Sequence, residues 1–505
     1  MVKRLTMLMG GLVLSTGMAL AQTTVTGKVV SQEDGEPVIG ASVRIVGTKT
    51  GTATDVDGNF TLPNASKDAV LEISYLGMQT KTMKASAKMK IILASAEESK
   101  AWNYWMVAKI LQAYNFLVLT DTYGDIPFTG ALDVENNPHA AFDDSKTVVY
   151  PGILEMLDAA IAKLDDAKAA EKASPLGTAD CFLGGSMDSW AGFAKSLKLK
   201  MYLKDFDAHK SDIQALLSAG GLLEQDCAWV NWEDGANKGN PLYEFNIRQL
   251  NTTENIRACH TFLEYLLDKK DPRIIKLYEV TANAKKTLGY SSDEELVAHM
   301  DECYEGLPCG DKPTTDETTE GGIAISKSSR MKQAYDDAVY LMNEAECELM
   351  IAEAYARLGD AEKAEEYYNK GVLAGFSRWG FDGTAFVDGA YKFDKADMLH
   401  SIAMQYWVTY AGANAYDGWM TRNRLGIPEV QANITVRKST TALQRELSDG
   451  YVLGNLVDPG ASNMNAGEYP MRLLYPTATT LYNSAAAKYV EENGNSLTKK
   501  LWWEK

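Results

Sequence analysis

Histidine and cysteine are scarce in this chain of 505 residues, with five and six copies respectively. The histidines form no H-E-x-x-H or His-x-His pattern, and the cysteine spacing fits no zinc site, so we expect no metal centre. Residues 55–59 begin like a calcium loop but lack its later bidentate Glu, and they suit a turn better. Cys303 and Cys309 are close in sequence, and both a disulfide and two free thiols remain open for them.

Signatures of catalysis are missing as well. The sequence contains no G-x-S-x-G nucleophile elbow and no P-loop. With 68 acidic residues, chance pairs of carboxylates are guaranteed, so their abundance does not indicate a glycosidase. We therefore expect a protein that is not an enzyme, with no catalytic residue and no cofactor.

Positive charge is in deficit. Lys and Arg total 50 against 68 Asp and Glu, which gives a net charge of -18. A field of this sign repels phosphate backbones, so nucleic acid is not expected as a partner. Attachment to an anionic membrane through a basic patch is equally unexpected. Neutral sugars and other proteins remain as partners.

Long apolar runs are absent, and the short one at the N-terminus has the features of a signal peptide. Lys3 and Arg4 precede the apolar stretch 5–14, and Ala19-Leu20-Ala21 fits a signal-peptidase site. The apolar stretch is too short to cross a bilayer. We expect residues 1–21 to direct export, and cleavage would leave no Cys near the new N-terminus to carry a lipid.

The period of the apolar residues changes near residue 95. Within 22–95 they alternate, as in Leu71, Ile73 and Tyr75, and turn signals such as Asp57-Gly58 separate the runs. This pattern predicts a small all-β sandwich of the Ig-like or prealbumin-like kind. From residue 97 to residue 505 helical spacing dominates, so we expect a multidomain chain with a mainly α-helical second domain.

Residues 346–372 predict two helices that form a hairpin. Gly359 can end the first helix and Asp360 can cap the second. Small residues stand where the two helices would cross, which is typical of tetratricopeptide-type hairpins.

Aromatic residues are abundant, with 10 Trp and 25 Tyr. Flat rings stack on the apolar C–H faces of sugars, while Asn, Asp and Arg bond to the hydroxyls. The loop-rich stretch 225–256 places Trp229, Trp232 and Tyr243 beside several Asn. Trp379 lies in another stretch, 376–393, which is rich in Gly. These four residues are the candidate ligand-binding residues, and membership of the core is the alternative for them.

Two resemblances follow from particular motifs. Residues 25–93 carry G-x-V, P-V-x-G-A-x-V and T-D-x-D-G-x-F elements, and resemble the carboxypeptidase-regulatory-like domain of SusC-type TonB-dependent transporters. YGDIPFTGAL at 123–132, WAGFAKSLKLKMYLK at 190–204 and QYWVTYAGANAYDGWMTRNRLGIPE at 405–429 resemble the SusD/RagB family, in its SusD-like branch. This second resemblance implies non-catalytic binding of glycans for uptake with a SusC-like transporter at the outer-membrane surface.

The chain departs from both families. SusD-like members usually begin with a lipidated Cys and an opening helical segment, whereas here the β-domain takes that place. The plug and barrel that follow a SusC-type front domain are absent, and the join falls near 94–99. A natural fusion and a merger of two neighbouring genes both remain open. A periplasmic location is the alternative to the surface, and a scaffold that only contacts proteins is the alternative function.

Overall fold

The computed structural model describes residues 23–505 apart from 34, 67–68, 76, 87, 94, 133–136, 251–255, 308–327, 433–435, 439–444, 448–449, 459–464 and 466. The predicted signal peptide and Cys309 therefore lie outside the described residues. The chain divides into two compact units. The N-terminal unit comprises Met1–Gln112 and Asp158–Gly177, and the helical unit comprises Ala113–Leu157 and Thr178–Lys505.

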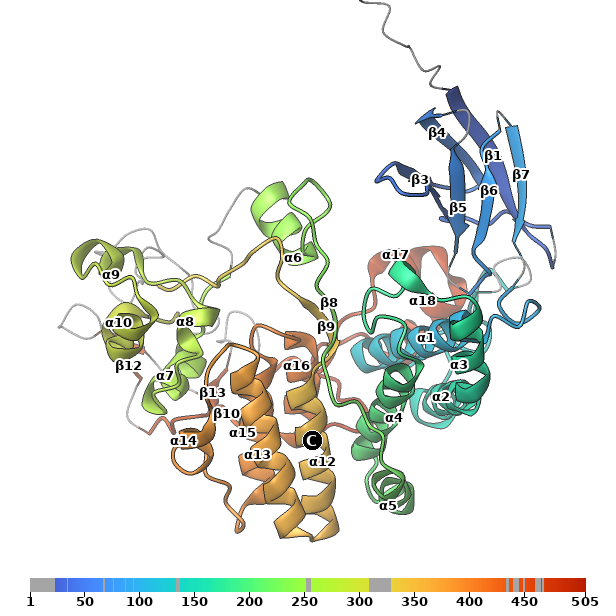
Figure 1. Cartoon of the computed structure of the whole chain (residues 1–505). Coiled ribbons are helices and arrows are strands. Elements are labelled where there is room, and N and C mark those ends of the chain that lie inside the picture. The colour runs from blue at the N-terminus through green and yellow to red at the C-terminus, as the bar shows by residue number, and fades with distance from the viewer. Residues whose placement is uncertain are drawn as a thin grey trace, which may run out of the picture. The chain divides into compact units, whose positions relative to one another are not determined.

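Two small sheets form the first part of the N-terminal unit (Figure 1). Their strands are β1 (Thr23–Ser31), β2 (Ser42–Ile45), β3 (Gly51–Ala53), β4 (Asn59–Ala65), β5 (Val70–Ser74), β6 (Lys81–Lys84) and β7 (Lys88–Leu93). One sheet has the order β4-β1-β7 and the other the order β3-β2-β5-β6. Strand β1 runs antiparallel to β4 and parallel to β7, and the pairs of the second sheet are antiparallel.

The predicted alternation produces the core of these sheets. Val25, Val43, Leu71 and Ile73 are fully or almost fully buried, and every buried residue of this cluster comes from 25–91. A β-carbon at Gly27 would lie 2.5 Å from the Phe60 ring, so glycine is what lets this ring pack across β1. The expected β-structure before residue 95 is thus present, while the Ig-like or prealbumin-like class stays a prediction.

Helices dominate the rest of the chain, as predicted. The long ones are α1 (Trp102–Tyr123), α2 (Tyr150–Ala162), α3 (Leu164–Ala173), α4 (Met187–Lys204), α5 (Lys210–Ala219), α7 (His260–Asp268), α12 (Glu344–Leu358), α13 (Ala361–Ser377), α15 (Met398–Tyr410), α16 (Ala415–Leu425) and α18 (Ser484–Asn493). Short ones are α6 (Pro241–Tyr243), α8 (Ile274–Leu277), α9 (Ala282–Thr287), α10 (Asp293–Ala298), α11 (Met300–Cys303), α14 (Thr384–Val387) and α17 (Thr477–Tyr482). Two π-helical turns, at Ser145–Val149 and Glu244–Gln249, and a 3-10 turn at Gly177–Ala179 accompany them.

Small two-stranded ribbons join the helices. They pair β8 (Cys227–Trp229) with β9 (Val339–Met342), β10 (Val430–Gln431) with β13 (Leu456–Val457), and β11 (Val436–Lys438) with β12 (Arg445–Leu447). In the part of the chain that the structure describes, no helix has both the length and the apolar character to cross a membrane.

Helices α12 and α13 form the predicted hairpin. Gly359 has a φ of +87°, which favours glycine, and ends α12. The Asp360 carboxylate then accepts the backbone N–H of Lys363 at 3.1 Å and caps α13. Helix α15 packs against α12. The tetratricopeptide classification of this hairpin stays a prediction.

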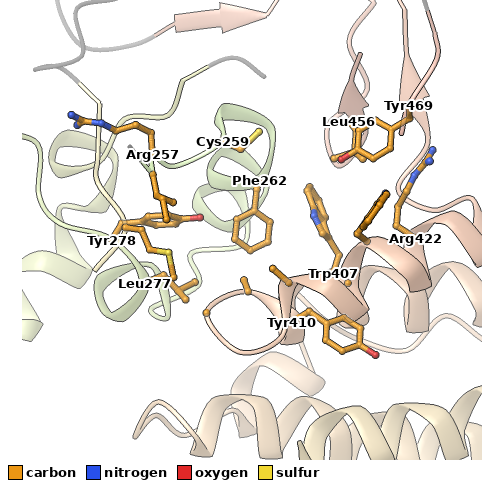
Figure 2. Close-up of a pocket in the computed structure, with 17 residues that line it drawn as sticks. Arg257, Cys259, Phe262, Leu277, Tyr278, Trp407, Tyr410, Arg422, Leu456 and Tyr469 are labelled. Carbon is orange, nitrogen blue, oxygen red and sulfur yellow. The ribbon is translucent and has the colours of Figure 1, made fainter. Parts of the chain in front are cut away.

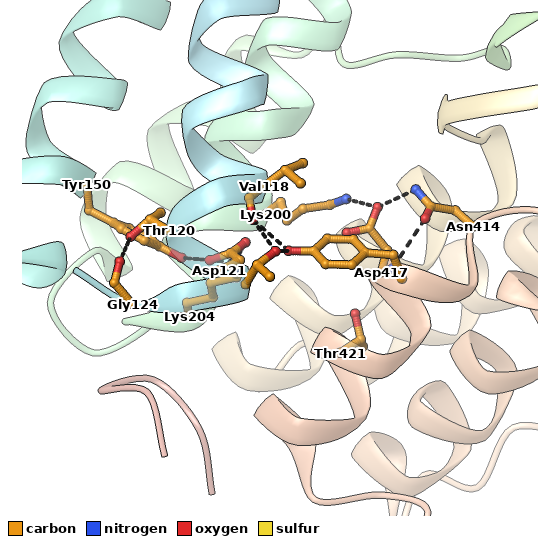
Figure 3. Close-up of polar contacts among 12 residues, drawn as sticks. Val118, Thr120, Asp121, Gly124, Tyr150, Lys200, Lys204, Asn414, Asp417 and Thr421 are labelled. Carbon is orange, nitrogen blue, oxygen red and sulfur yellow. Dashed lines mark hydrogen bonds and ion pairs between the residues drawn. The ribbon is translucent and has the colours of Figure 1, made fainter. Parts of the chain in front are cut away.

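A buried network of charges fixes the start of α16. Lys200 on α4 lies 2.5 Å from Glu346 on α12 and 3.0 Å from Asp417 on α16. Burial disfavours the charge of Lys200, but the two carboxylates outweigh it and raise the pKa of this lysine. Asn414, the N-cap of α16, donates to Asp417 at 2.7 Å. Figure 3 shows this network, in which the turn before α16 is held from several sides.

A second buried carboxylate lies nearby on α1. Asp121 accepts hydrogen bonds from Lys204 of α4 and from the Tyr150 hydroxyl, as Figure 3 also shows. Tyr416 on α16 donates to the carbonyl of Val118 at 2.9 Å. These contacts join α16 to α1 and α4. The position of α16 is therefore fixed by its neighbours.

Candidate functional site

A cavity of about 330 Å³, here named the aromatic cavity, lies between the α7–α8 region and helices α15 and α16. Its aromatic lining residues are Phe262, Tyr278, Trp407, Tyr410, Trp419 and Tyr469. Figure 2 shows Phe262 and Trp407 side by side, with Tyr278 on one flank and Tyr469 on the other. The lining thus combines segments that lie far apart in the sequence.

The tryptophans of this cavity are positioned by their neighbours. The Trp407 ring meets Phe262 edge to face, with 5.0 Å between ring centroids, and lies 5.6 Å from Tyr265. The Trp419 indole donates its N–H to the carbonyl of Pro470 at 2.7 Å. Both tryptophans are half-buried. Fixed and partly exposed rings of this kind offer a surface on which a flat apolar ligand face can stack.

A second cavity, of about 470 Å³ and here named the polar cavity, adjoins the first. The two share Leu277, Met331, Gly412 and Ala415 in their linings. Its other lining residues include Asn240, Lys276, Lys332, Gln333, Asp337, Tyr340, Trp379 and Asn414. An apolar, aromatic hollow therefore lies next to one that presents amide, ammonium and carboxylate groups.

Gly412 stands where the two cavities meet. Its φ is +69°, and a β-carbon there would lie 2.6 Å from Leu277 and 3.0 Å from the Trp379 ring. A side chain at this position would be strained and would push Trp379 outward. Glycine therefore lets the Trp379 ring lie over the turn that connects α15 to α16.

The structure brings one of the four sequence-predicted residues into this site. Trp379 lines the polar cavity and is half-buried. Tyr243 does not line it, although Asn240, Pro241 and Leu242 of the same segment do. The half-buried Tyr243 ring instead faces Arg248, 5.4 Å from the ring centroid.

Trp229 and Trp232 form a pair and are not among the described residues that line the two cavities, although Val339, the strand partner of Trp229, lines the polar cavity. Their rings stack with centroids 4.7 Å apart and an angle of 10°, and Phe182 meets Trp229 edge to face. Among the described residues, neither buried indole N–H has a hydrogen-bond acceptor. Each tryptophan covers one face of the other, so only the outer faces could receive a ligand ring.

Several residues of the aromatic cavity were not predicted, namely Phe262, Tyr278, Trp407, Trp419 and Tyr469. A signal existed in one stretch, 407–419, where two tryptophans and two tyrosines stand with Gly412 and Gly418. Rings interrupted by glycines do not suit a continuous helix face, and glycine often marks close approach of a ligand or ring. The sequence alone marked this stretch only as part of a family resemblance.

Acidic side chains are few in the described lining of the two cavities. Among the described residues that line the two cavities, Asp337 is the one carboxylate. Burial raises its pKa, and one of its oxygens accepts the backbone N–H of Ala334 at 2.7 Å. Glycoside hydrolysis generally needs two carboxyl groups on either side of the scissile bond. The described lining does not supply that pair.

Comparisons with known families and structures agree with this architecture. Residues 49–447 match a SusD-like family described as "Starch-binding associating with outer membrane". The match begins within the N-terminal strands, before the predicted boundary near residue 97. A SusD homolog from Bacteroides uniformis has a TM-score of 0.60 at 19% identity, covering 81% of this chain and 83% of that one. A chitin-binding SusD homolog from Flavobacterium johnsoniae has a TM-score of 0.58 at 19% identity, with 79% and 80% covered. The mainly helical SusD-like fold is therefore confirmed.

Shorter likenesses connect the chain to transporters. It is 43% identical to TonB-dependent receptor SusC of Bacteroides thetaiotaomicron over 98 residues, which are 19% of this chain and 10% of that protein. It is 36% identical to TonB-dependent receptor P3 of Formosa agariphila over 70 residues, which are 14% and 7% of the two proteins. The chain thus spans a tenth or less of the length of these curated relatives.

Proposed function

Because the chain belongs to the SusD-like family, we propose that it binds oligosaccharides without cleaving them, in the adjoining aromatic and polar cavities. The observation that carries this proposal is the set of fixed, half-buried rings beside a polar hollow. A sugar has apolar C–H faces and hydroxyl edges, so it needs both kinds of surface together. Trp407 and Trp419 provide ring surface, and Trp379 provides it on the polar side.

The polar cavity can bond to hydroxyl groups through particular atoms. The Gln333 side-chain oxygen accepts from Asn246 at 3.1 Å, which leaves its NH2 group to donate to a ligand. Asp337 accepts Ala334 through one oxygen, which leaves the other for a hydroxyl. The side chains of Asn240 and Asn414 instead cap helices α6 and α16, so these residues form part of the cavity wall.

We also propose that the protein acts at the outer membrane together with a SusC-like transporter. Support comes from the family description and from the 98-residue likeness to SusC. The motifs in 25–93 that resemble the carboxypeptidase-regulatory-like domain support the same partner. Export by the signal peptide at 1–21 is part of this proposal. Co-purification of a barrel protein from outer membranes would support it, and a chain found only in the soluble periplasm would contradict it.

Isothermal titration against maltoheptaose, chitohexaose, mannohexaose and oligogalacturonate tests the binding function. We expect Trp379→Ala to weaken the binding of the best ligand by about 1–3 kcal/mol, which is the scale of stacking on one aromatic ring. Trp102→Ala is the matched control, because Trp102 packs on Trp105 and lines neither cavity among the described residues. If none of the four saccharides, nor a wider set, binds, the scaffold function takes precedence.

The same titration separates the remaining sequence-predicted residues. Trp229 in β8, Trp232 just after it and Tyr243 in α6 stay proposed ligand contacts. If they hold sugar, alanine at each weakens binding while the melting temperature stays unchanged. A loss of thermal stability with unchanged affinity would assign the Trp229–Trp232 stack to the core.

A further inference from the structure

We propose that the glycan taken by this site is anionic and carries carboxylate or sulfate groups on more than one sugar unit. This inference rests on the proposed function, because it names the class of saccharide that the two adjoining cavities accept. It is carried by the charges that line the cavities and by what those charges bond to.

The charged residues that line the cavities are mostly positive, whereas the net charge of the whole chain is negative. Although the net charge is -18, their described lining residues include Arg257, Lys276, Lys332 and Arg422 against the single carboxylate of Asp337. A cleft with low-dielectric walls concentrates the field of the charges that line it. An anion inside therefore meets a local attraction that the rest of the surface does not offer.

Arg422 supplies the cation of the aromatic cavity. Its Nε donates to the carbonyl of Pro428 at 3.0 Å, and its Nη1 donates to the Asn423 side-chain oxygen at 3.2 Å. The guanidinium also lies 4.8 Å from the centre of the Tyr469 ring. Glu504 acts on it only from a distance and bonds instead to Asn423 at 3.1 Å. The bonded partners of Arg422 among the described residues are thus neutral.

Lys332 is the corresponding cation of the polar cavity. Its ammonium group donates to the carbonyl of Ile275 at 2.8 Å. The structure gives it no bonded carboxylate among the described residues, and two of its three N–H donors remain available. A cation in a recess that bonds only to neutral oxygens is incompletely compensated, and a ligand carboxylate or sulfate would complete it with charge-assisted hydrogen bonds.

The other two cations are not assigned as ligand contacts. Lys276 is paired with Asp293 at 2.6 Å. Arg257 donates to the carbonyl of Ser328 at 2.9 Å, and Figure 2 shows its guanidinium directed away from the ring cluster. The contact groups are therefore Arg422 and Lys332, one in each cavity. Because the shared lining of Leu277, Met331, Gly412 and Ala415 lies between the cavities, one short chain would need acidic groups on separate units to meet both.

Matched pairs of saccharides test the inference. One pair is oligogalacturonate and its methyl ester, which differ in charge on one backbone. The other is a sulfated galactan oligosaccharide and the same oligosaccharide after desulfation. For at least one pair we expect the acidic member to bind about tenfold or more tightly, the effect of one charge-assisted hydrogen bond. The pair that shows the preference identifies carboxylate or sulfate as the group. Raising NaCl from about 0.05 M to about 0.5 M should reduce the preference.

Charge-removing variants connect the preference to its residues. Arg422→Met and Lys332→Met should each weaken binding of the acidic member about tenfold, and by a clearly larger factor than binding of the neutral member. Lys395→Met is the control, since Lys395 loses the same charge but pairs with Glu362 and Glu365 and lines neither cavity among the described residues. Arg422→Lys keeps the charge and should keep part of the preference, which guards against a variant that merely misfolds.

The outcomes separate this inference from the proposed function. The proposal of an anionic ligand is wrong if neutral members bind as tightly as acidic ones. It is also wrong if neither NaCl nor the two substitutions changes the preference for the acidic member. In both cases the proposal of glycan binding stands. If no saccharide of either kind binds, the proposed function fails and the inference fails with it.

Discussion

Lys200 holds its charge where water is nearly excluded. Its side chain is 12% exposed and that of its partner Glu346 is fully buried. A buried ion pair adds little by itself, because desolvation consumes most of the attraction. Removing one member is costly, however, since the charge that remains has neither water nor a partner. The stability of the helical unit should therefore depend strongly on Lys200.

Lys200→Met tests this dependence. The variant leaves Glu346 and Asp417 facing each other without a cation, and we expect a loss of about 3–5 kcal/mol in the free energy of unfolding. Urea denaturation followed by circular dichroism measures it. Lys395→Met is a matched control, because Lys395 also lies between two carboxylates, Glu362 and Glu365, but on the open surface.

The control should change little, because exposed ion pairs are weak. Equal losses in both variants would contradict the argument from burial and would indicate that chain entropy or helix propensity decides the effect. A Lys200→Met variant as stable as the parent would show that Glu346 takes up a proton at small cost.

At the level of elements, the crossing of α12 and α13 depends on the absence of a side chain. A β-carbon on Gly371 would lie 2.8 Å from Leu349 and 3.2 Å from the carbonyl of Ala345. Alanine in a helix is intrinsically better than glycine by about 1 kcal/mol. The collision should outweigh that gain, since overpacking a tight interface typically costs about 1–3 kcal/mol.

Gly371→Ala is therefore expected to lower the melting temperature in spite of the better helix propensity. The double variant Gly371→Ala with Leu349→Ala removes the colliding side chain, and its loss should be smaller than the sum of the two single losses. Additive losses, or a Gly371→Ala variant more stable than the parent, would show that the two helices are not in close contact there.

The elements also show which parts of the structure the sequence could predict. The hairpin followed from Gly359 and Asp360, because helix ends depend on residues within one turn. The strands followed from alternation, which is equally local. The aromatic cavity combines Phe262 and Tyr278 with residues of α15 and α16 and with Tyr469. No period connects such distant segments, so only the packed helices bring these residues together.

Trp229 and Trp379 illustrate the same point within the candidate site. Both were predicted from aromatic and polar composition, which identifies residues suited to sugars but not what lies beside them. Trp379 reaches a cavity because Gly412 leaves room for its ring, whereas Trp229 stacks on Trp232. A residue distant in sequence decided the position of Trp379, and for Trp229 composition did not reveal that a ring three residues away covers one of its faces.

At the scale of the whole molecule, the chain has two compact units, and the sheets carry a core of their own. All buried members of that core come from 25–91, and none of them is supplied by a helix of the described chain. A unit with a separate core can unfold as a separate cooperative step. We therefore expect calorimetry of the intact protein to show two transitions.

The same substitution, Ile to Val, in each unit shows which thermal transition belongs to which unit. Ile73 in β5 and Ile402 in α15 are both fully buried, and replacing either by Val removes one methylene, at a cost of about 0.5–1.5 kcal/mol. Ile73→Val should lower one midpoint by about 4–8 °C per kcal/mol, as for a small domain, and leave the other in place. Ile402→Val should lower only the other midpoint, and by less, because the larger helical unit has a larger unfolding entropy. If a single transition responds to both substitutions, the sheets and helices unfold as one cooperative body, and the separate core does not make the sheets an independent unit.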